Sequence, residues 1–345
     1  MRTPRVTLKD IANASGVDIS TVSRSLSGSY GINKDTRERV LAIAASLNYH
    51  PNRVARGLAT GRSYTIGLIV SDIRNPFFAE VARGAEDAAC AAGCEVVLCN
   101  SDLDPAKQMR YIQSLLSKRV DGILMNSVAG LDRTQQEQLS SAGLPVVLLN
   151  RPRSVSNFST VTADNDEGGF IAGDYLVRLG HRRIAHITGP RDHGNLRERA
   201  RGFLRAVTNS GDCAPPVLLH GDQSFKGGYE LARTMLARHP EVTALFAAND
   251  IMAFGAAGAF IEAGRSIPGN MSIIGFDNLE LCPVMHPPLT TVHQPKYEMG
   301  KAGVEMILTG VDNKEPSLPE HRQLGVKLIE RQSCAPPVRA HAYTA

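Results

Sequence analysis

The sequence lacks the features that mark membrane and secreted proteins. It has no run of about 18 consecutive apolar residues, which a membrane-spanning helix requires. The first ten residues, MRTPRVTLKD, contain no apolar stretch of a secretory signal. The six cysteines are scattered and include no C-x-x-C pair, so we expect reduced thiols rather than disulfides or zinc ligands. These absences together predict a cytoplasmic protein.

Motifs for catalysis are also missing. The chain contains no G-x-x-x-x-G-K-[ST], no G-x-S-x-G, no H-E-x-x-H, and no G-x-G-x-x-G after its first predicted strand. His181, His186 and His193 are separated by a Gly-Pro pair and by spacings that do not place them on one helix face as zinc ligands. We therefore expect no catalytic residue, no metal and no cofactor, and we do not expect an enzyme.

Positive charge is concentrated at one end of the chain. Residues 1–62 contain ten Lys and Arg against four Asp and Glu, a net charge of +6. The rest of the chain contains 28 Lys and Arg and 30 Asp and Glu, a net charge of −2. A small basic head on a slightly acidic body indicates a polyanion-binding module joined to a part with another task. The 345 residues, 43% hydrophobic and 21% charged, predict two or three globular domains.

Three short helices are predicted in the basic head, over residues 7–15, 18–26 and 33–47, with Gly16 ending the first. Each follows a short polar residue that can cap it: Thr7, Asp18 and Asn33. The third helix places four apolar side chains on one face: Val40, Ile43, Ala44 and Leu47. This arrangement is typical of a helix-turn-helix module, whose second helix enters the major groove of DNA.

The outward positions of the second helix support DNA binding. They are small or can donate hydrogen bonds: Ile19, Ser20, Ser23 and Arg24. Arg24 suits a bidentate contact to guanine, and Ser20 can bond a base or a phosphate. The alternative is a small helical cap on a larger domain.

Residues 50–61 follow the head and allow two interpretations. After Pro51 they can form about two helical turns, but so short a helix is marginal alone and Gly57 weakens it by roughly 1 kcal/mol relative to Ala. The segment is either a helix that forms only when something holds it, or a plain linker.

From Tyr64 to about Ser333, short apolar runs alternate with helix-length segments. The pattern predicts parallel strands buried on both faces, in two sheets because some 270 residues exceed one comfortable core. The predicted strands are 65–70, 95–99, 121–125, 145–149, 183–188, 244–248 and 272–276. We expect the chain to cross between the two lobes at Thr160–Asp164 and again at Thr290–Pro295.

Polar residues follow most of these strands: Asp72, Asn75, Asn126, Asn150, Arg151, Asn249, Asp250, Asp277 and Asn278. Ligands of open parallel sheets bind beyond the carboxyl ends of the strands. Carboxylates and amides beside aromatic faces suit a small hydroxylated molecule, with three aromatic side chains nearby: Phe77, Phe78 and Phe276. For any one of these Asp and Asn residues, a plain helix N-cap is an equally good interpretation.

Several ordered motifs resemble a known family along nearly the whole chain. VTLKDIANASGVDISTVSRSLSG and TRERVLAIAASLNYHPNRVARGLATG resemble the N-terminal region of the lactose-repressor and galactose-repressor family of bacterial transcription regulators. IGLIVSDIRNPFFAEVARGAEDAA, LVRLGHRRIAHITGP, LFAANDIMAFGAAGAF, SIIGFDN and LTTVHQP resemble that family's effector-binding core. The resemblance implies an α/β protein with an all-α helix-turn-helix head and a two-lobed core, similar to periplasmic binding proteins, with two parallel doubly wound sheets.

The resemblance also implies the domain limits. They are a DNA-binding domain (1–50), a hinge helix and linker (51–62), an N-terminal core subdomain (63–162 plus 293–325), a C-terminal core subdomain (163–292 plus 326–338) and a tail (339–345).

By the same resemblance, a homodimer, or a dimer of dimers, binds a pseudo-palindromic operator in double-stranded DNA. The residues implied to bind DNA are Thr7, Ile19, Ser20, Thr21, Ser23, Arg24, Asn33, Asn52, Ala55 and Leu58. Among them Ala55 enters the minor groove and Leu58 wedges into the central base step, which bends the duplex. The tail after Glu330 carries no heptads, which disfavours a tetramer.

A small-molecule effector, a sugar, sugar acid or polyol, is implied to bind between the lobes. The matching positions are Asp72, Asn75, Phe77, Asn150, Arg199, Asn249, Asp277 and Gln294. Gln223 stands where several members carry a stacking aromatic residue, and Asn150 stands where some carry aspartate. Effector binding is expected to change the angle between the lobes and so relieve repression, although a corepressor obeys the same thermodynamics. The rivals are a solute-binding protein without a DNA role, an enzyme with Asp250 or Asp277 as base, and a corepressor-dependent regulator of nucleoside or sugar-acid metabolism.

Overall fold

A computed structural model describes residues 6–28, 30–49, 61–126, 131–151, 157–191, 193–313 and 318–338. The chain divides into two compact units, Met1–Ser63 and Tyr64–Ala345. Within the described ranges, no helix is long and apolar enough to cross a membrane. The predicted hinge residues Asn52, Ala55 and Leu58 lie outside the described residues.

The described residues of the first unit form the helices α1 (Leu8–Ser15), α2 (Ile19–Leu26) and α3 (Lys34–Ser46). A capping box between Thr7 and Asp10 starts α1, and Gly16 ends it with a left-handed φ of 69°. Five side chains form the core: Ile11, Ala12, Val22, Val40 and Ala44. The predicted helix-turn-helix pattern is therefore confirmed.

Two details of this unit differ from the prediction. Asp18 occupies the N-cap position of α2, but its side chain makes no cap hydrogen bond. Leu47 is the C-cap of α3 and is 36% exposed, so it lies outside the core face that Val40 and Ala44 share. The helical period would place Leu47 on this core face if the helix continued, but α3 ends at Ser46.

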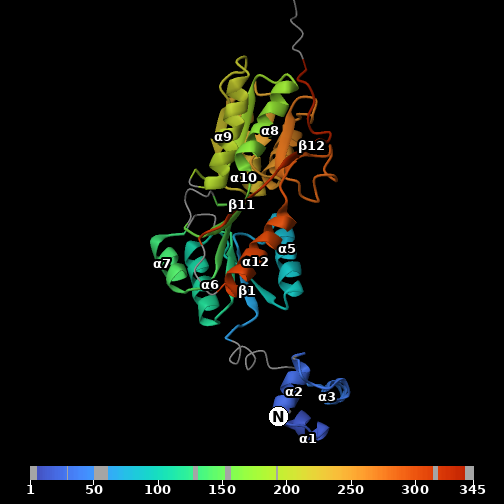
Figure 1. Ribbon diagram of the computed structural model, residues 1–345. Helices are drawn as coiled ribbons and strands as arrows, with labels where there is room; N and C mark the ends of the chain where they lie inside the picture. The colour runs from blue at the N-terminus through green and yellow to red at the C-terminus, as the bar shows by residue number, and fades with distance from the viewer. Residues whose placement is uncertain are drawn as a thin grey trace, which may run out of the picture. The chain divides into compact units, whose positions relative to one another are not determined.

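The second unit contains two six-stranded sheets with helices packed on them (Figure 1). We call the part around the first sheet the first lobe. Its strand order is β11-β5-β4-β3-β1-β2, and all neighbours are parallel. The elements are β1 (Thr65–Val70), α5 (Phe77–Ala91), β2 (Glu95–Asn100), α6 (Pro105–Ser117), β3 (Gly122–Met125), α7 (Arg133–Ser141), β4 (Val146–Leu149), β5 (Ser159–Ala163), α12 (Lys296–Asp312) and β11 (His321–Leu324).

The second lobe surrounds the other sheet, with order β12-β10-β9-β8-β6-β7. Its elements are α8 (Asn165–Arg178), β6 (Ile184–Thr188), α9 (Gly194–Asn209), β7 (Val217–His220), α10 (Phe225–Arg238), β8 (Ala244–Ala247), α11 (Asp250–Glu262), β9 (Ser272–Asp277), β10 (Thr290–His293) and β12 (Lys327–Ile329). Only β12 runs antiparallel to its neighbour in this sheet. The seven predicted strands are all present, and the α/β class with two largely parallel sheets is confirmed.

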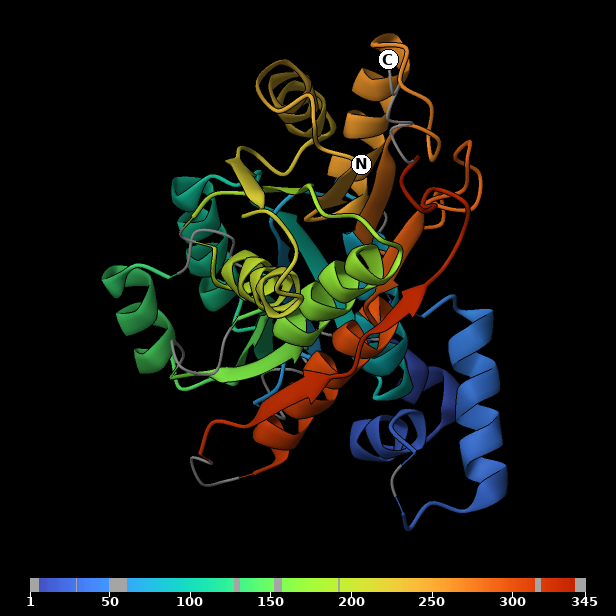
Figure 2. The ribbon, with the colours of Figure 1, turned by 90° about the horizontal axis from the view of Figure 1, so that it is seen from above.

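The chain passes between the lobes after β5, after β10 and between β11 and β12. Figure 2 shows β11 and β12 in red, one following the other from the first sheet to the second. The segments predicted as crossings form strands themselves: Thr160–Ala163 belongs to β5 of the first sheet and Thr290–His293 to β10 of the second. The prediction looked for buried strands as apolar runs. It therefore missed these two strands, which are rich in threonine.

Candidate effector cavity and DNA-reading helix

Helix α2 presents its polar face to solvent. Ile19, Ser20, Ser23 and Arg24 are all exposed, as predicted, whereas Val22 on the opposite face is fully buried. The Arg24 Nε donates to the Ser20 carbonyl oxygen at 3.3 Å, which directs the guanidinium along the helix surface. These four side chains therefore form an exposed face on α2.

The other predicted DNA-binding residues of this unit take different positions. Thr7 and Asn33 are exposed N-caps of α1 and α3, and Asn33 accepts from the Asp35 amide at 2.9 Å. Thr21 is half-buried on α2. Thr7 and Asn33 therefore have a local structural role in addition to the predicted contact with DNA.

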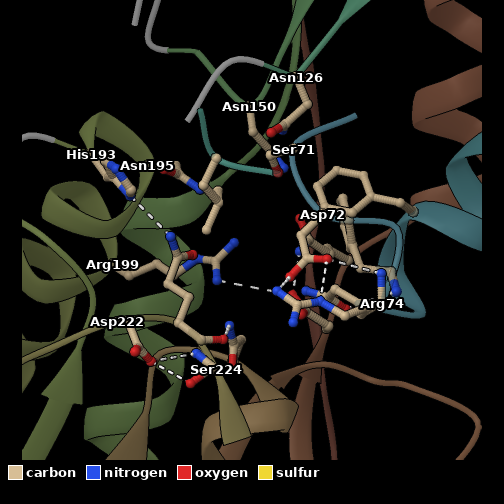
Figure 3. A pocket seen from close by; sticks show the side chains of 18 residues that line it. Ser71, Asp72, Arg74, Asn126, Asn150, His193, Asn195, Arg199, Asp222 and Ser224 are labelled. Carbon is tan, nitrogen blue, oxygen red and sulfur yellow. Dashed lines mark hydrogen bonds and ion pairs between the residues drawn. The ribbon is translucent and has the colours of Figure 1, made fainter. Parts of the chain in front are cut away.

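A cavity of about 190 Å³ lies in the second unit, at the carboxyl ends of strands from both sheets (Figure 3). All eight predicted effector residues line it, together with Ser71, Arg74, Phe78, Leu103, Asn126, His193, Asn195, Asp222, Gln223 and Ser224. Strand order reverses beside β1 in the first sheet and beside β6 in the second. These are the switch points at which open α/β sheets bind ligands.

Arg199 is the buried cation of this cavity, on the face of α9 that packs against α8. Its Nε donates to Asn165 at 2.8 Å and one terminal nitrogen donates to the Ala248 carbonyl at 2.6 Å. The guanidinium lies 3.7 Å from the ring centre of Phe276 and 3.9 Å from an Asp277 oxygen. Burial lowers the pKa of Arg199 to about 10, so it stays charged at neutral pH.

Close packing of α8 and α9 places this side chain. A Cβ at Gly169 of α8 would lie 2.0 Å from the Arg199 carbonyl oxygen, so only glycine permits this approach. The helices α8 and α9 thus bring Asn165 and Arg199 into contact, and sequence spacing alone does not reveal that pair.

Asp250 and Asp277, which follow β8 and end β9, are buried carboxylates. Burial raises the pKa of both Asp250 and Asp277, while the charges of Arg199 and Lys296 act in the opposite direction on Asp277. Asp277 lines the cavity and accepts a hydrogen bond from Gln294. Asp250 instead accepts from the Leu279 amide and the Thr291 hydroxyl, and it does not line the cavity. An enzymatic role for Asp250 in this cavity is therefore contradicted.

Other sequence expectations for the cavity are wrong in detail. Arg151, Asn278 and Phe276 do not line the cavity. The Phe276 ring is fully buried against the Arg199 guanidinium. Asn249 lines the cavity and also caps α11, because its Oδ1 accepts from the Met252 amide at 2.8 Å. The N-cap and ligand-site interpretations therefore both apply to this residue.

Sequence reasoning missed His193 and Lys296. His193, considered from the sequence only as a zinc ligand, lines the cavity and bonds Gln223 at 2.9 Å. Lys296 is 1% exposed, and its ammonium donates to the carbonyls of Asp277 and Asn278 at 2.7 and 3.0 Å. Because Lys296 begins α12 of the first lobe, it ties that lobe to the turn after β9. A lysine at a helix start gives no sequence signal of burial.

Among the described residues, no group of three His, Cys, Asp or Glu side chains is placed to hold a metal ion. His186 is instead buried among aromatic rings. It stacks on Phe246 with centroids 4.5 Å apart, lies 5.2 Å from Phe203, and its Nδ1 is 2.9 Å from the Phe246 carbonyl oxygen. Burial lowers the pKa of His186 to about 4.

His186 is expected to make the folded protein sensitive to mild acid. Its folded pKa lies below the unfolded value of about 6.5, so its contribution to stability is complete above pH 6.5 and declines as pH falls toward 4. Between pH 7.5 and pH 5 the wild type should lose about 2 kcal/mol more unfolding free energy than His186→Phe. Urea unfolding at both pH values measures this difference, and equal losses in the two proteins would contradict it.

Comparison with known proteins supplies the family. Residues 7–52 match the family described as bacterial regulatory proteins, lacI family. Residues 63–332 match the family described as periplasmic binding proteins and sugar binding domain of LacI family. The two matches cover the head and the two-lobed unit in turn.

Curated relatives align over nearly the full length. The chain is 34% identical to the HTH-type transcriptional repressor PurR of Photobacterium profundum, covering 89% of this chain and 92% of the relative. It is 35% identical to the catabolite control protein A of Priestia megaterium, covering 95% and 99%.

Solved structures agree in fold. The lac repressor dimer bound to operator and the anti-inducer ONPF superposes with a TM-score of 0.86 at 29% identity, over 96% of this chain and 100% of that one. A LacI family regulator from Enterococcus faecium with bound ribose gives 0.72 at 33% identity, over 79% and 99%. The chain is a regulator rather than an enzyme. It belongs to the lacI family of bacterial regulatory proteins, DNA-binding transcriptional repressors under the control of an effector.

Proposed function

We propose that this repressor acts as a dimer whose two heads bind the half-sites of a pseudo-palindromic operator. Two-fold symmetry of the protein then matches two-fold symmetry of the DNA. The exposed face of α2 supports base reading by Ile19, Ser20 and Arg24, with further contacts from Thr7, Thr21, Ser23 and Asn33. As a DNA-binding protein it works at its operator in the cytoplasm, associated with the nucleoid.

The effector binds in the cavity between the lobes. Its proposed contacts are the eight predicted residues that line this cavity: Asp72, Asn75, Phe77, Asn150, Arg199, Asn249, Asp277 and Gln294. A small sugar or polyol is the proposed effector class, since one related regulator is solved with ribose bound. The observation that carries the function is one chain with an exposed helix-turn-helix face and a separate two-lobed unit enclosing a polar cavity.

Effector binding changes the angle between the lobes. We place the lobe boundaries at residues 63–162 plus 293–325 and 163–292 plus 326–338, next to the three inter-lobe passages. The hinge of residues 51–62 would transmit the change through Asn52, Ala55 and Leu58, which contact the minor groove in this proposal. An inducer that lowers operator affinity is the proposed sign, with a coupling of about 1–3 kcal/mol, or roughly 5- to 150-fold.

Selection of DNA from a random library by the full-length protein tests this function. The selected sequences should form an inverted repeat, and the protein should prefer them to scrambled fragments by about 10³-fold or more. Selected sequences that contain no inverted repeat would contradict binding as a dimer. An absence of any preference, with and without small molecules, would overturn the regulator function.

A further inference from the structure

Among the described residues that line the cavity, each cation lies beside a carboxylate. Among the described lining residues, two cations, Arg74 and Arg199, stand against three carboxylates, Asp72, Asp222 and Asp277. The Arg74 guanidinium donates to both oxygens of Asp72 at 2.9 Å each. Arg199 lies 3.9 Å from Asp277. Each cation therefore faces a carboxylate, and a bound phosphate or carboxylate would approach a net negative surface.

Helix N-termini at the cavity carry partial positive charge, but side chains of the protein bond some of their first-turn amides. The Asn75 Oδ1 accepts from the Phe77 amide at the start of α5, the Ser224 hydroxyl from the Gly227 amide in α10, and the Asn249 Oδ1 from the Met252 amide in α11. The N-cap residues of α5 and α9, Pro76 and His193, make no side-chain cap bond. In each of α5, α10 and α11 one first-turn amide is bonded by a side chain of the protein and is not free to bind an anion.

The cavity instead presents unsatisfied acceptors. Two lining side chains are more than nine-tenths buried and carry an oxygen with no hydrogen-bond partner among the described residues: Asn150 Oδ1 and Gln294 Oε1. The Gln294 nitrogen donates to Asp277, which fixes the orientation of that amide. The hydrogen bonds that Asp222 and Asp277 accept all reach Oδ1. A ligand with several hydroxyl donors would satisfy these oxygens, whereas an ionised phosphate or carboxylate group cannot donate to them.

The size and apolar surface of the cavity narrow the ligand further. Its volume of about 190 Å³ lies below the roughly 300–1,000 Å³ of pockets for drug-sized ligands. Phe77 and Phe78, both of the first lobe, are its aromatic lining residues, while the lining from the second lobe is polar. Two aromatic side chains from one lobe, among polar residues from both lobes, suit a sugar ring with C–H groups on one face better than a purine base, which stacks on both of its faces.

We propose that the effector is an uncharged, hydroxyl-rich molecule of monosaccharide size, and that phosphorylated and acidic sugars are excluded. This inference rests on the proposed function, because it names the class of molecule that the same cavity binds. It narrows the sugar, sugar acid and polyol expectation of the sequence to its neutral members. Asn150 and Gln294 accept from hydroxyl groups of the ligand, and the carboxylates repel anions.

Thermal unfolding of the full-length protein, with every compound at the same concentration, tests whether charged ligands are excluded. The panel contains neutral pentoses, hexoses and polyols, including D-ribose and D-glucose, the phosphate esters of both sugars, D-gluconate, D-glucosamine, cellobiose and hypoxanthine. At least one neutral monosaccharide or polyol should raise the unfolding temperature, and its charged counterpart should not. A larger shift from a phosphate, acid, amine, disaccharide or purine would overturn the proposal. So would the absence of any shift from the neutral compounds.

A pair of variants tests the acceptor role. Gln294→Met removes a buried amide at the cavity, whereas Gln108→Met removes a buried amide that bonds Gln135 and does not line the cavity. Calorimetric titration with the neutral compound of largest shift should show about tenfold weaker binding to Gln294→Met. Gln108→Met should lose stability yet keep the wild-type affinity. Equal affinities of Gln294→Met and wild type would overturn the role of this acceptor.

Operator binding separates this inference from the proposed function. The same preparation is assayed for its preference between selected and scrambled DNA. Retained preference together with a charged or purine ligand overturns only the effector class. Lost preference together with sugar binding overturns only the regulator function.

Discussion

Replacing Arg199 with methionine is expected to destabilise the protein by about 3–5 kcal/mol, because breaking a buried ion pair leaves its partner uncompensated. The substitution keeps an aliphatic stem near the Phe276 ring but removes the donors to Asn165 and Ala248 and the charge beside Asp277. Urea unfolding of the full-length protein measures the loss. The stabilisation of the protein by its effector should also disappear, since Arg199 lines the cavity.

Arg201→Met is the matched control on the same helix. Arg201 is 66% exposed and pairs with Asp166 at the surface, so its loss should cost no more than about 1 kcal/mol. Arg199→Lys should recover only part of the stability, because an ammonium lacks the planar fork that reaches several acceptors and stacks on Phe276. Equal destabilisation by Arg199→Met and Arg201→Met would contradict the assigned role.

The loss of unfolding free energy caused by Arg199→Met should depend on pH in the direction expected for a buried carboxyl group. Burial raises the pKa of Asp277 above its unfolded value, so the folded state binds the extra proton. A group of this kind favours folding more as pH falls from the folded pKa toward the unfolded pKa near 4. The destabilisation should therefore be smaller at pH 5 than at pH 8, and the reverse order would show that Asp277 is not the group left uncompensated.

Replacing Arg24 with alanine is expected to weaken operator binding by about 1–3 kcal/mol, the discrimination that one bidentate base contact supplies. Binding to scrambled DNA should change far less. Arg24 lies exposed on α2 beside Ser20, and its Nε bond to the Ser20 carbonyl restricts the side chain before DNA arrives. Fluorescence anisotropy with the selected operator and a scrambled fragment, at one stated salt concentration, measures both affinities.

Arg39→Ala is the control for a cation of the same head. Arg39 is exposed on α3 and is not among the residues predicted to contact DNA, so its loss should leave the ratio of operator to scrambled affinity unchanged. If Arg24→Ala lowers both affinities equally, Arg24 contacts a phosphate and does not read a base.

Much of this protein follows from local sequence patterns. Thr7, Gly16 and Asn33 delimit the helices of the head because capping and left-handed termination depend on neighbouring residues alone. Seven strands follow from apolar runs that parallel sheets bury on both faces. The eight cavity residues follow from motif resemblance and from the rule that parallel strands end at one edge of a sheet.

Edge strands and crossings were decided by tertiary structure. Strands β11 and β12 lie at sheet edges, where partial burial weakens the apolar signal, and the edge strand β7 is a short run of four residues, Val217–His220. Strand β5 is rich in threonine, yet β4 and β11 flank it in the sheet. No local pattern states which distant segment will supply the neighbouring strand, because that depends on contacts between residues far apart in sequence.

The sequence alone determined which residue types gather at the strand ends, and the tertiary structure decided what each one does there. Asn249 and Asp250 are adjacent, yet one lines the cavity and the other turns inward to Leu279 and Thr291. Lys296 is buried because two lobes meet around it. Burial, charge pairing and unsatisfied oxygens depend on the packing of elements from both lobes, and these properties define the chemistry of the cavity.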